Sequence, residues 1–216
     1  MQSEPMKKMV NISFLIMSVC LAESTLVFFG MQNGLCPSFD GLTLSSLFQR
    51  AAFDLLAGLV VAIPALLLIR RNPKQSFMLN ANRELVVSIA IYGLISLVLA
   101  AKLGAGIAQL YKPVYLFFFV ALPEELLFRG LLFPRMKAAL DASRMEFPVA
   151  MAGLLSGAIW GLCHSVSKIL IGAPPIIAIA SSIAGYAIAG CILCFLTEKR
   201  GDLNLAVTAH AILDSL

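Results

Sequence analysis

Apolar residues dominate this chain in seven runs that short polar segments separate. The runs lie at about residues 9–30, 51–69, 85–101, 113–133, 147–167, 175–196 and 204–216. An apolar run of about 20 residues can cross the roughly 30 Å hydrocarbon core of a bilayer as a helix. We therefore expect an all-α, polytopic transmembrane helix bundle of about seven spans. The range is roughly six to eight, because the runs at 85–101 and 204–216 are short.

The composition supports a membrane protein. Of the 216 residues, 60% are hydrophobic and 13% are charged, and the mean hydropathy is +0.91. Soluble domains are about half apolar and about a quarter charged. The length suits a single integral membrane domain over residues 1–216. The five cysteines are an odd number and imply no disulfide framework. No basic run suits nucleic acid, so we expect no nucleic-acid partner.

The distribution of basic residues predicts the orientation in the membrane. With the N-terminus in the cytoplasm, Arg50, Lys102, Lys112 and Lys168 fall on the outer side and Arg129 is embedded. The remaining eleven of the 16 Lys and Arg residues then fall on the cytoplasmic side, as the positive-inside rule requires. We therefore expect a bacterial inner or plasma membrane protein with a cytoplasmic N-terminus and, with seven spans, an external C-terminus.

Two carboxylates and a guanidinium lie inside the apolar run at 113–133, in the stretch Pro123 to Arg129. Ionisable groups inside a membrane are costly, face the protein interior and are functional by default. Glu125 and Arg129 are four residues apart and share a helical face, so Arg129 can keep Glu125 ionised. Glu124 points about 100° away, toward apolar neighbours, which suits a general base. Pro123 removes a helical hydrogen bond and can kink the span, which would admit water.

Both histidines of the chain lie in late apolar runs, each with a partner four residues away. Trp160 precedes His164, and Asp214 follows His210. A glutamate and a histidine together can deprotonate water, and a second histidine can stabilise an oxyanion. The simpler interpretation is a buried ion-pair network with hydrogen-bonded core histidines. One arginine cannot neutralise two buried carboxylates, which favours the functional interpretation.

In chain order, these residues form the patterns EExxxR, WxxxH and HxxxD. They resemble the motifs EExxxR, FxxxH and HxxxN of the CAAX-protease and bacteriocin-processing family, which are membrane-embedded glutamate-type endopeptidases. The resemblance covers the motif-bearing half of the chain, about residues 113–216. Two positions depart from the family: Trp160 replaces phenylalanine, and Asp214 replaces asparagine. An ionised aspartate cannot donate a hydrogen bond, so Asp214 is protonated, orients His210, or belongs to a cation site.

The resemblance implies an all-helical intramembrane endopeptidase that hydrolyses a peptide bond of a membrane-associated protein or peptide. By motif position, Glu124 is the general base, His164 assists it, and His210 and Asp214 belong to the oxyanion site. The supporting residues are Glu125, Arg129 and Trp160. We expect no cofactor. A zinc ion would have to use the four catalytic candidates as ligands, although the zinc-protease signature HExxH is absent.

Two other functions remain open from the sequence. One is a non-catalytic membrane immunity or partner-binding protein of the same fold, which would tolerate replacement of Glu124. The other is a proton-coupled transporter that uses the buried carboxylates as a relay. A relay has no need of two histidines with helical partners. The small residues from Ala178 to Gly190 allow close helix packing, either within the bundle or against a second copy.

The predicted depths of the motifs impose one condition on the fold. Counted from the cytoplasmic ends of the runs, Glu124 lies about 9 residues in, His210 about 6, and His164 about 17, at about 1.5 Å per residue. The three side chains can meet if the run at 147–167 begins later or if its first turns lie outside the hydrocarbon. We expect the second arrangement.

Overall fold

The computed structural model describes residues 4–39, 42–71, 73, 76–103 and 106–215, and these ranges contain helices and no strands. This confirms the all-α prediction. The first three helices are α1 (Glu4–Gln32), α2 (Leu44–Arg71) and α3 (Arg83–Leu103). The central part of the chain is a series of consecutive helical segments, α4 (Ile107–Val114), η3 (Tyr115–Ala121), α5 (Leu122–Glu125), η4 (Leu126–Leu132) and α6 (Phe133–Ala142). The last three helices are α7 (Pro148–Leu170), α8 (Pro175–Arg200) and α9 (Asn204–Ser215).

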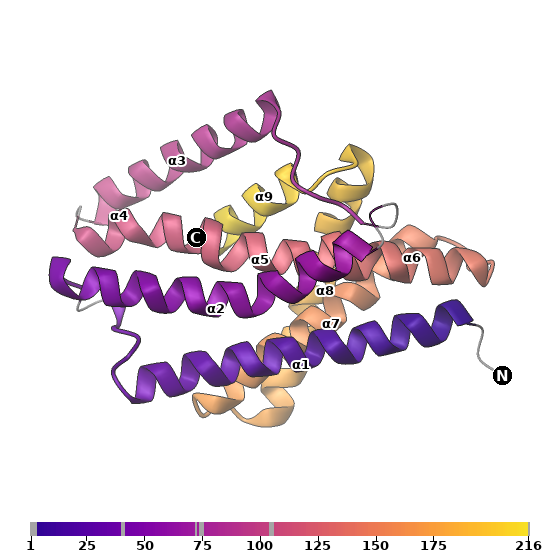
Figure 1. Cartoon of the computed structure of the whole chain (residues 1–216), viewed down its shortest axis with the longest axis horizontal. Helices are drawn as coiled ribbons and strands as arrows, with labels where there is room; N and C mark the ends of the chain where they lie inside the picture. The colour runs from indigo at the N-terminus through magenta and orange to yellow at the C-terminus, as the bar shows by residue number, and fades with distance from the viewer. Residues whose placement is uncertain (1–3, 40–41, 72, 74–75, 104–105, 216) are drawn as a thin grey trace.

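Five helices of the described chain are long and apolar enough to cross a membrane. They are Met6–Gln32, Leu44–Arg71, Arg83–Lys102, Pro148–Leu170 and Pro175–Arg200. Figure 1 shows α1, α2 and the central helical series running roughly alongside one another, while α7 and α8 cross them. Many large apolar side chains on these helices face outward, as expected where lipid replaces water.

The central helical series runs from Ile107 to Ala142 and passes through two π-helical segments, η3 and η4, on either side of α5. Pro123 lies in α5 and has no N–H to donate. Just before it, the N–H of Leu122 bonds the carbonyl of Phe117, five residues back. Wider π turns of this kind are frequent at functional sites. The π turn at the end of η3 accommodates Pro123, and Glu124 and Glu125 follow directly after this proline.

The extended central series accounts for the depth at which the motifs meet. It continues to Ala142, well beyond the predicted end of the run at 133. Glu124 therefore lies 18 residues before Ala142, and His164 lies 16 residues after Pro148. Both helices extend by similar lengths from the α6–α7 connection, which brings the two side chains to the same level.

The last predicted run forms α9, which has 12 residues; residue 216 of that run lies outside the described residues. At about 1.5 Å per residue this helix is about 18 Å long, shorter than the hydrocarbon core. Its side chains Ala206, Val207 and Ala211 are fully buried. Such a short helix is stable here because surrounding protein covers it.

An extended segment between α2 and α3, which we call the strap (Phe77–Asn82), covers the start of α9. The N–H of Phe77 donates to the carbonyl of Gly130 in η4 at 3.1 Å. The N–H of Leu203 donates to the carbonyl of Met78 at 3.1 Å. Asn204, the first residue of α9, exchanges hydrogen bonds of 2.9 and 2.8 Å with the backbone of Asn80. The strap thus ties the central series to α9.

Helices α7 and α8 pack with their backbones in close contact. A Cβ atom built on Gly190 would lie 2.5 Å from the Cα of Gly157, and one on Gly161 would lie 2.5 Å from the carbonyl oxygen of Ser182. No side chain fits at these distances, so the glycines are required there. Ser182 and Gly190 of α8 therefore pack within the bundle, whereas Ser181, Ala184 and Gly185 are exposed, so packing of this helix against a second copy stays a prediction.

Candidate active site

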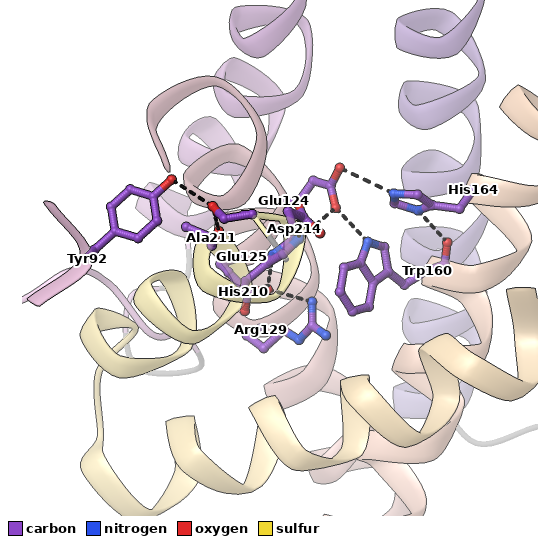
Figure 2. A network of polar contacts seen from close by, with 10 residues as sticks. Tyr92, Glu124, Glu125, Arg129, Trp160, His164, His210, Ala211 and Asp214 are labelled. Atoms are coloured by element: carbon purple, nitrogen blue, oxygen red, sulfur yellow. Dashed lines mark hydrogen bonds and ion pairs between the residues drawn. The ribbon is translucent and has the colours of Figure 1, made fainter. Parts of the chain in front are cut away.

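Glu125 is the fully buried member of the glutamate pair. Its side chain and that of Arg129 are 0% exposed. The Oε1 atom of Glu125 accepts a hydrogen bond of 2.8 Å from Nη1 of Arg129, and Nδ1 of His210 lies 2.8 Å from the same oxygen. Figure 2 shows this chain of contacts from the central series to α9. Glu125 thus joins the arginine of its own motif to the histidine of the third motif.

Glu124 is more accessible, with 19% of its side chain exposed. Nε1 of Trp160 donates a hydrogen bond of 2.6 Å to Oε2 of Glu124. Oε1 lies 3.7 Å from Nε2 of His164, and Oε2 lies 3.9 Å from Nε2 of His210 (Figure 2). The structure therefore brings together Glu124 and both histidines, each from a different part of the chain.

His164 is oriented by its own helix and by one aromatic ring. Its Nδ1 lies 3.1 Å from the backbone carbonyl of Trp160. A carbonyl only accepts hydrogen bonds, so Nδ1 carries a proton and Nε2 faces Glu124. The ring of Tyr186 stacks on the imidazole with centroids 4.3 Å apart. Nothing in the sequence pattern indicated Tyr186.

His210 lies between two carboxylates. Its Nδ1 contacts Oε1 of Glu125, and Oδ2 of Asp214 lies 3.2 Å from its Nε2. Of the three options for Asp214, this geometry favours an orienting role. Nδ1 is hydrogen-bonded to Glu125 and Nε2 faces Asp214, so a proton on Nε2 can be offered to a developing oxyanion. The side chain of Asp214 is 35% exposed, so it has room to move away.

The ring of Trp160 contacts Arg129 and both histidines. It lies 4.0 Å from the guanidinium carbon of Arg129, a cation–π contact. The same ring makes edge contacts with both imidazoles, at centroid distances of 5.6 Å to His164 and 4.9 Å to His210. A phenylalanine could supply these ring contacts but not the N–H that binds Glu124.

A cavity of about 250 Å³ leads away from this centre. Glu124, Phe128 and His164 line one part of it, and Arg50 and Asp54 of α2 line another. The rest of the wall is mainly apolar and comes from α1, α2, η3 and α7. Glu23 of α1 also lines the cavity, and sequence reasoning missed it. The signal was present, because Glu23 is an acid within the apolar run at 9–30.

A metal site was considered for the four catalytic candidates. In the part of the chain that the structure describes, no three His, Cys, Asp or Glu side chains are grouped so as to hold an ion. Trp160 already donates to Oε2 of Glu124, and Glu125 engages Nδ1 of His210. These contacts suit a hydrogen-bonded acid–base centre.

Fold and site together define a polytopic membrane protein with a glutamate–histidine centre at the end of a cavity. Residues 106–216 match the Rce1-like family, described as type II CAAX prenyl endopeptidase Rce1-like. The matched region is slightly more than half of the chain, so this protein belongs to the Rce1-like family of CAAX-type intramembrane proteases. The family resemblance and the assignment to integral membrane proteins are confirmed. Comparison with curated proteins and with solved structures found no match.

Proposed function

We propose that this protein is an intramembrane endopeptidase that hydrolyses a peptide bond of a membrane-associated protein or peptide. In this proposal, Glu124 and His164 activate the attacking water. The observation that carries it is the position of Glu124, which is held by Trp160, lies within 4 Å of both imidazoles and lines a cavity.

The pair of Glu124 and His164 supplies two proton acceptors. Oε1 of the carboxylate and Nε2 of the imidazole face each other across 3.7 Å. A water bound beside both atoms would donate one hydrogen bond to each, which directs an oxygen lone pair toward the substrate. As the water oxygen bonds to the substrate carbonyl carbon, its proton passes to Glu124. Glu124 then gives that proton to the leaving amine nitrogen, and the peptide C–N bond breaks.

His210 provides the stabilisation of the negative oxygen. Its Nε2–H faces Asp214 and Glu124 in the free protein. When the substrate carbonyl becomes an oxyanion, this N–H can donate to it in place of Asp214, which is partly exposed and free to rotate. A pre-oriented donor stabilises the transition state more than the substrate. Glu125, held by Arg129, keeps the ring in this orientation from the other side.

The test uses purified protein in detergent and fluorogenic peptides of membrane-spanning length. Glu124→Gln, His164→Ala and His210→Ala should each lower kcat/KM by about 100-fold or more, since an acid–base group contributes about 10²–10⁴-fold. Glu146→Gln removes the same kind of charge from the exposed α6–α7 connection and should leave the rate unchanged. Thermal unfolding of every variant checks the fold.

Three results would contradict this proposal. Full activity of Glu124→Gln would remove the general base. A partner-binding role that survives Glu124→Gln, in a protein that cleaves no peptide, would favour the immunity-type alternative. Inactivation by a chelator and recovery with zinc would assign the chemistry to a metal instead, whereas we expect chelators to leave the rate unchanged.

A further inference from the structure

Glu23 is an acid in a membrane-spanning helix whose function the mechanism leaves unexplained. It lies in α1, nine residues before the helix ends at Gln32. Its side chain lines the same cavity as Glu124 and His164. An ionisable residue inside an apolar span is costly and is retained for a specific interaction. The question is what Glu23 binds.

No basic group of the described chain pairs with Glu23. The ion pairs of these residues involve other carboxylates. Glu23 and Glu124 both line this cavity. Two acids thus face one cavity with no cation between them.

The cationic side chains near the cavity are already engaged. Nε of Arg50 donates to both carboxylate oxygens of Asp54, at 2.9 and 2.8 Å. Arg129 is fully buried against Glu125 and Trp160. Among the described residues that line the cavity, Glu23 therefore has no basic partner, in a wall that is otherwise largely apolar.

We propose that Glu23 is a specificity-determining residue that binds a basic side chain of the substrate, a lysine or an arginine close to the cleaved bond. This inference rests on the proposed peptidase function. The occupant has to carry a positive charge, and the apolar lining, with Val27, Phe28 and Val120, suits the aliphatic stem of such a side chain. A bare metal ion fits poorly, since no three suitable ligands are grouped.

The location of the cavity gives this recognition a direct consequence. Glu124 and Glu23 line the same space, so a basic residue bound at Glu23 places the neighbouring peptide bond near the activated water. Lysine and arginine commonly flank the apolar segments of membrane proteins. The enzyme would therefore select apolar segments that carry one basic residue, and a neutral residue there would leave Glu23 without a partner.

The experiment compares peptides of about 20 apolar residues that differ at one variable position. In successive peptide sets, this position is shifted by one residue at a time through the middle of the peptide. At that position the peptide carries lysine, norleucine or glutamate. For the best lysine peptide, Glu23→Gln should raise KM by about tenfold, as expected for loss of one partly buried charge pair, with kcat nearly unchanged. The norleucine peptide should be cleaved equally by both proteins. Glu146→Gln is the matched control.

Two more variants guard against a folding defect. Glu23→Asp should retain the preference for lysine, and Glu23→Lys should reverse it in favour of the glutamate peptide. Acetylated and free N-termini distinguish a side-chain ammonium from a terminal amine, and we expect acetylation to have no effect. Equal KM values for lysine and norleucine in the unaltered protein would overturn the inference and leave the proposed peptidase function intact.

A binding measurement distinguishes the proposed specificity site at Glu23 from the proposed peptidase activity when no peptide is cleaved. If the protein cleaves none of the peptides, fluorescence anisotropy of the lysine and norleucine peptides still tests Glu23. Tighter binding of the lysine peptide that Glu23→Gln removes would support the specificity site and count against the peptidase. Equal binding of both peptides to both proteins would overturn the specificity site.

Discussion

The described residues include two buried Arg–carboxylate pairs at i,i+4 spacing, and they are built differently. In α2, Arg50 donates to both oxygens of Asp54 and to the carbonyl of Pro37. Asp54 also accepts from the hydroxyl of Tyr111 at 2.9 Å. The guanidinium carbon lies 4.1 Å from the ring centroid of Phe39. Nearly every polar atom of this pair has a partner, as expected of a structural network.

The pair of Glu125 and Arg129 is less complete although it is more deeply buried. A single hydrogen bond of 2.8 Å joins the two side chains. Among the described residues, Oε2 of Glu125 and both Nε and Nη2 of Arg129 find no hydrogen-bond partner. Unsatisfied buried polar groups are rare and occur at functional sites. We infer from this difference that the pair of Arg50 and Asp54 stabilises the fold. The pair of Glu125 and Arg129 contributes less stability than its burial would allow, and it positions His210.

Arg129→Ala should have the largest effect on stability and should also remove activity. It removes the guanidinium that pairs with Glu125, and breaking a buried ion pair costs about 3–5 kcal/mol. It also takes the cation away from Trp160 and frees His210. The free energy of unfolding can be measured by SDS titration in mixed micelles, together with cleavage rate per folded molecule. Unchanged yield and stability would contradict the assignment.

Arg50→Ala should destabilise by a similar but smaller amount, about 3 kcal/mol. Arg50 and Asp54 line the same cavity as Glu124, but their hydrogen bonds go to Pro37 and Tyr111 and not to Glu124 or the histidines, so kcat of the protein that remains folded should be within about twofold of the original. The same two measurements apply. A loss of activity as complete as that of Arg129→Ala would show that the two pairs are not separated in function.

Tyr111→Phe should cost about 1 kcal/mol, the usual net contribution of one hydrogen bond. It removes the hydroxyl that donates to Asp54 and keeps the ring, so it measures how much this one hydrogen bond contributes to the stability of the Arg50–Asp54 network. Activity should be unaffected. A cost near zero, measured by the same SDS titration, would mean that Arg50 alone satisfies Asp54.

Asp214→Asn should have the smallest effect. It restores the amide of the family motif, which can donate to the oxyanion, while it removes the carboxylate that orients His210. These two changes oppose each other, so we expect kcat to change by less than about threefold, that is about 0.7 kcal/mol. A loss of 100-fold would mean that the carboxylate itself is required at this position.

The sequence predicted the centre well because each motif is local. Spacing of four residues along a helix was enough to pair Glu125 with Arg129 and His210 with Asp214, as the structure shows. The meeting of Glu124 with both histidines followed from the family resemblance. The contact between Glu125 and His210 spans 85 residues, and no helical spacing indicates it.

Features that depend on distant parts of the chain escaped prediction. The π-helical segments η3 and η4 end just before Pro123 and Pro134, respectively, each of which interrupts the hydrogen bonds of a long helix, and the sequence suggested only a kink at Pro123. The burial of the short helix α9 depends on its packing against α3, η3 and α8, which its own residues do not indicate. Glu23 was missed because an isolated acid in an apolar run gives no hint of its partner. The folded structure places it in the wall of the same cavity as Glu124.

The strap makes the two halves of the chain interdependent. The matched family region begins at residue 106, yet the backbone that anchors the start of α9 belongs to Phe77–Asn82. A fragment beginning at residue 106 would expose the carbonyl of Gly130 and the side chain of Asn204 without their partners. We expect such a fragment to be unable to hold His210 in register, so the boundary that sequence similarity draws does not mark a place where the protein can be cut.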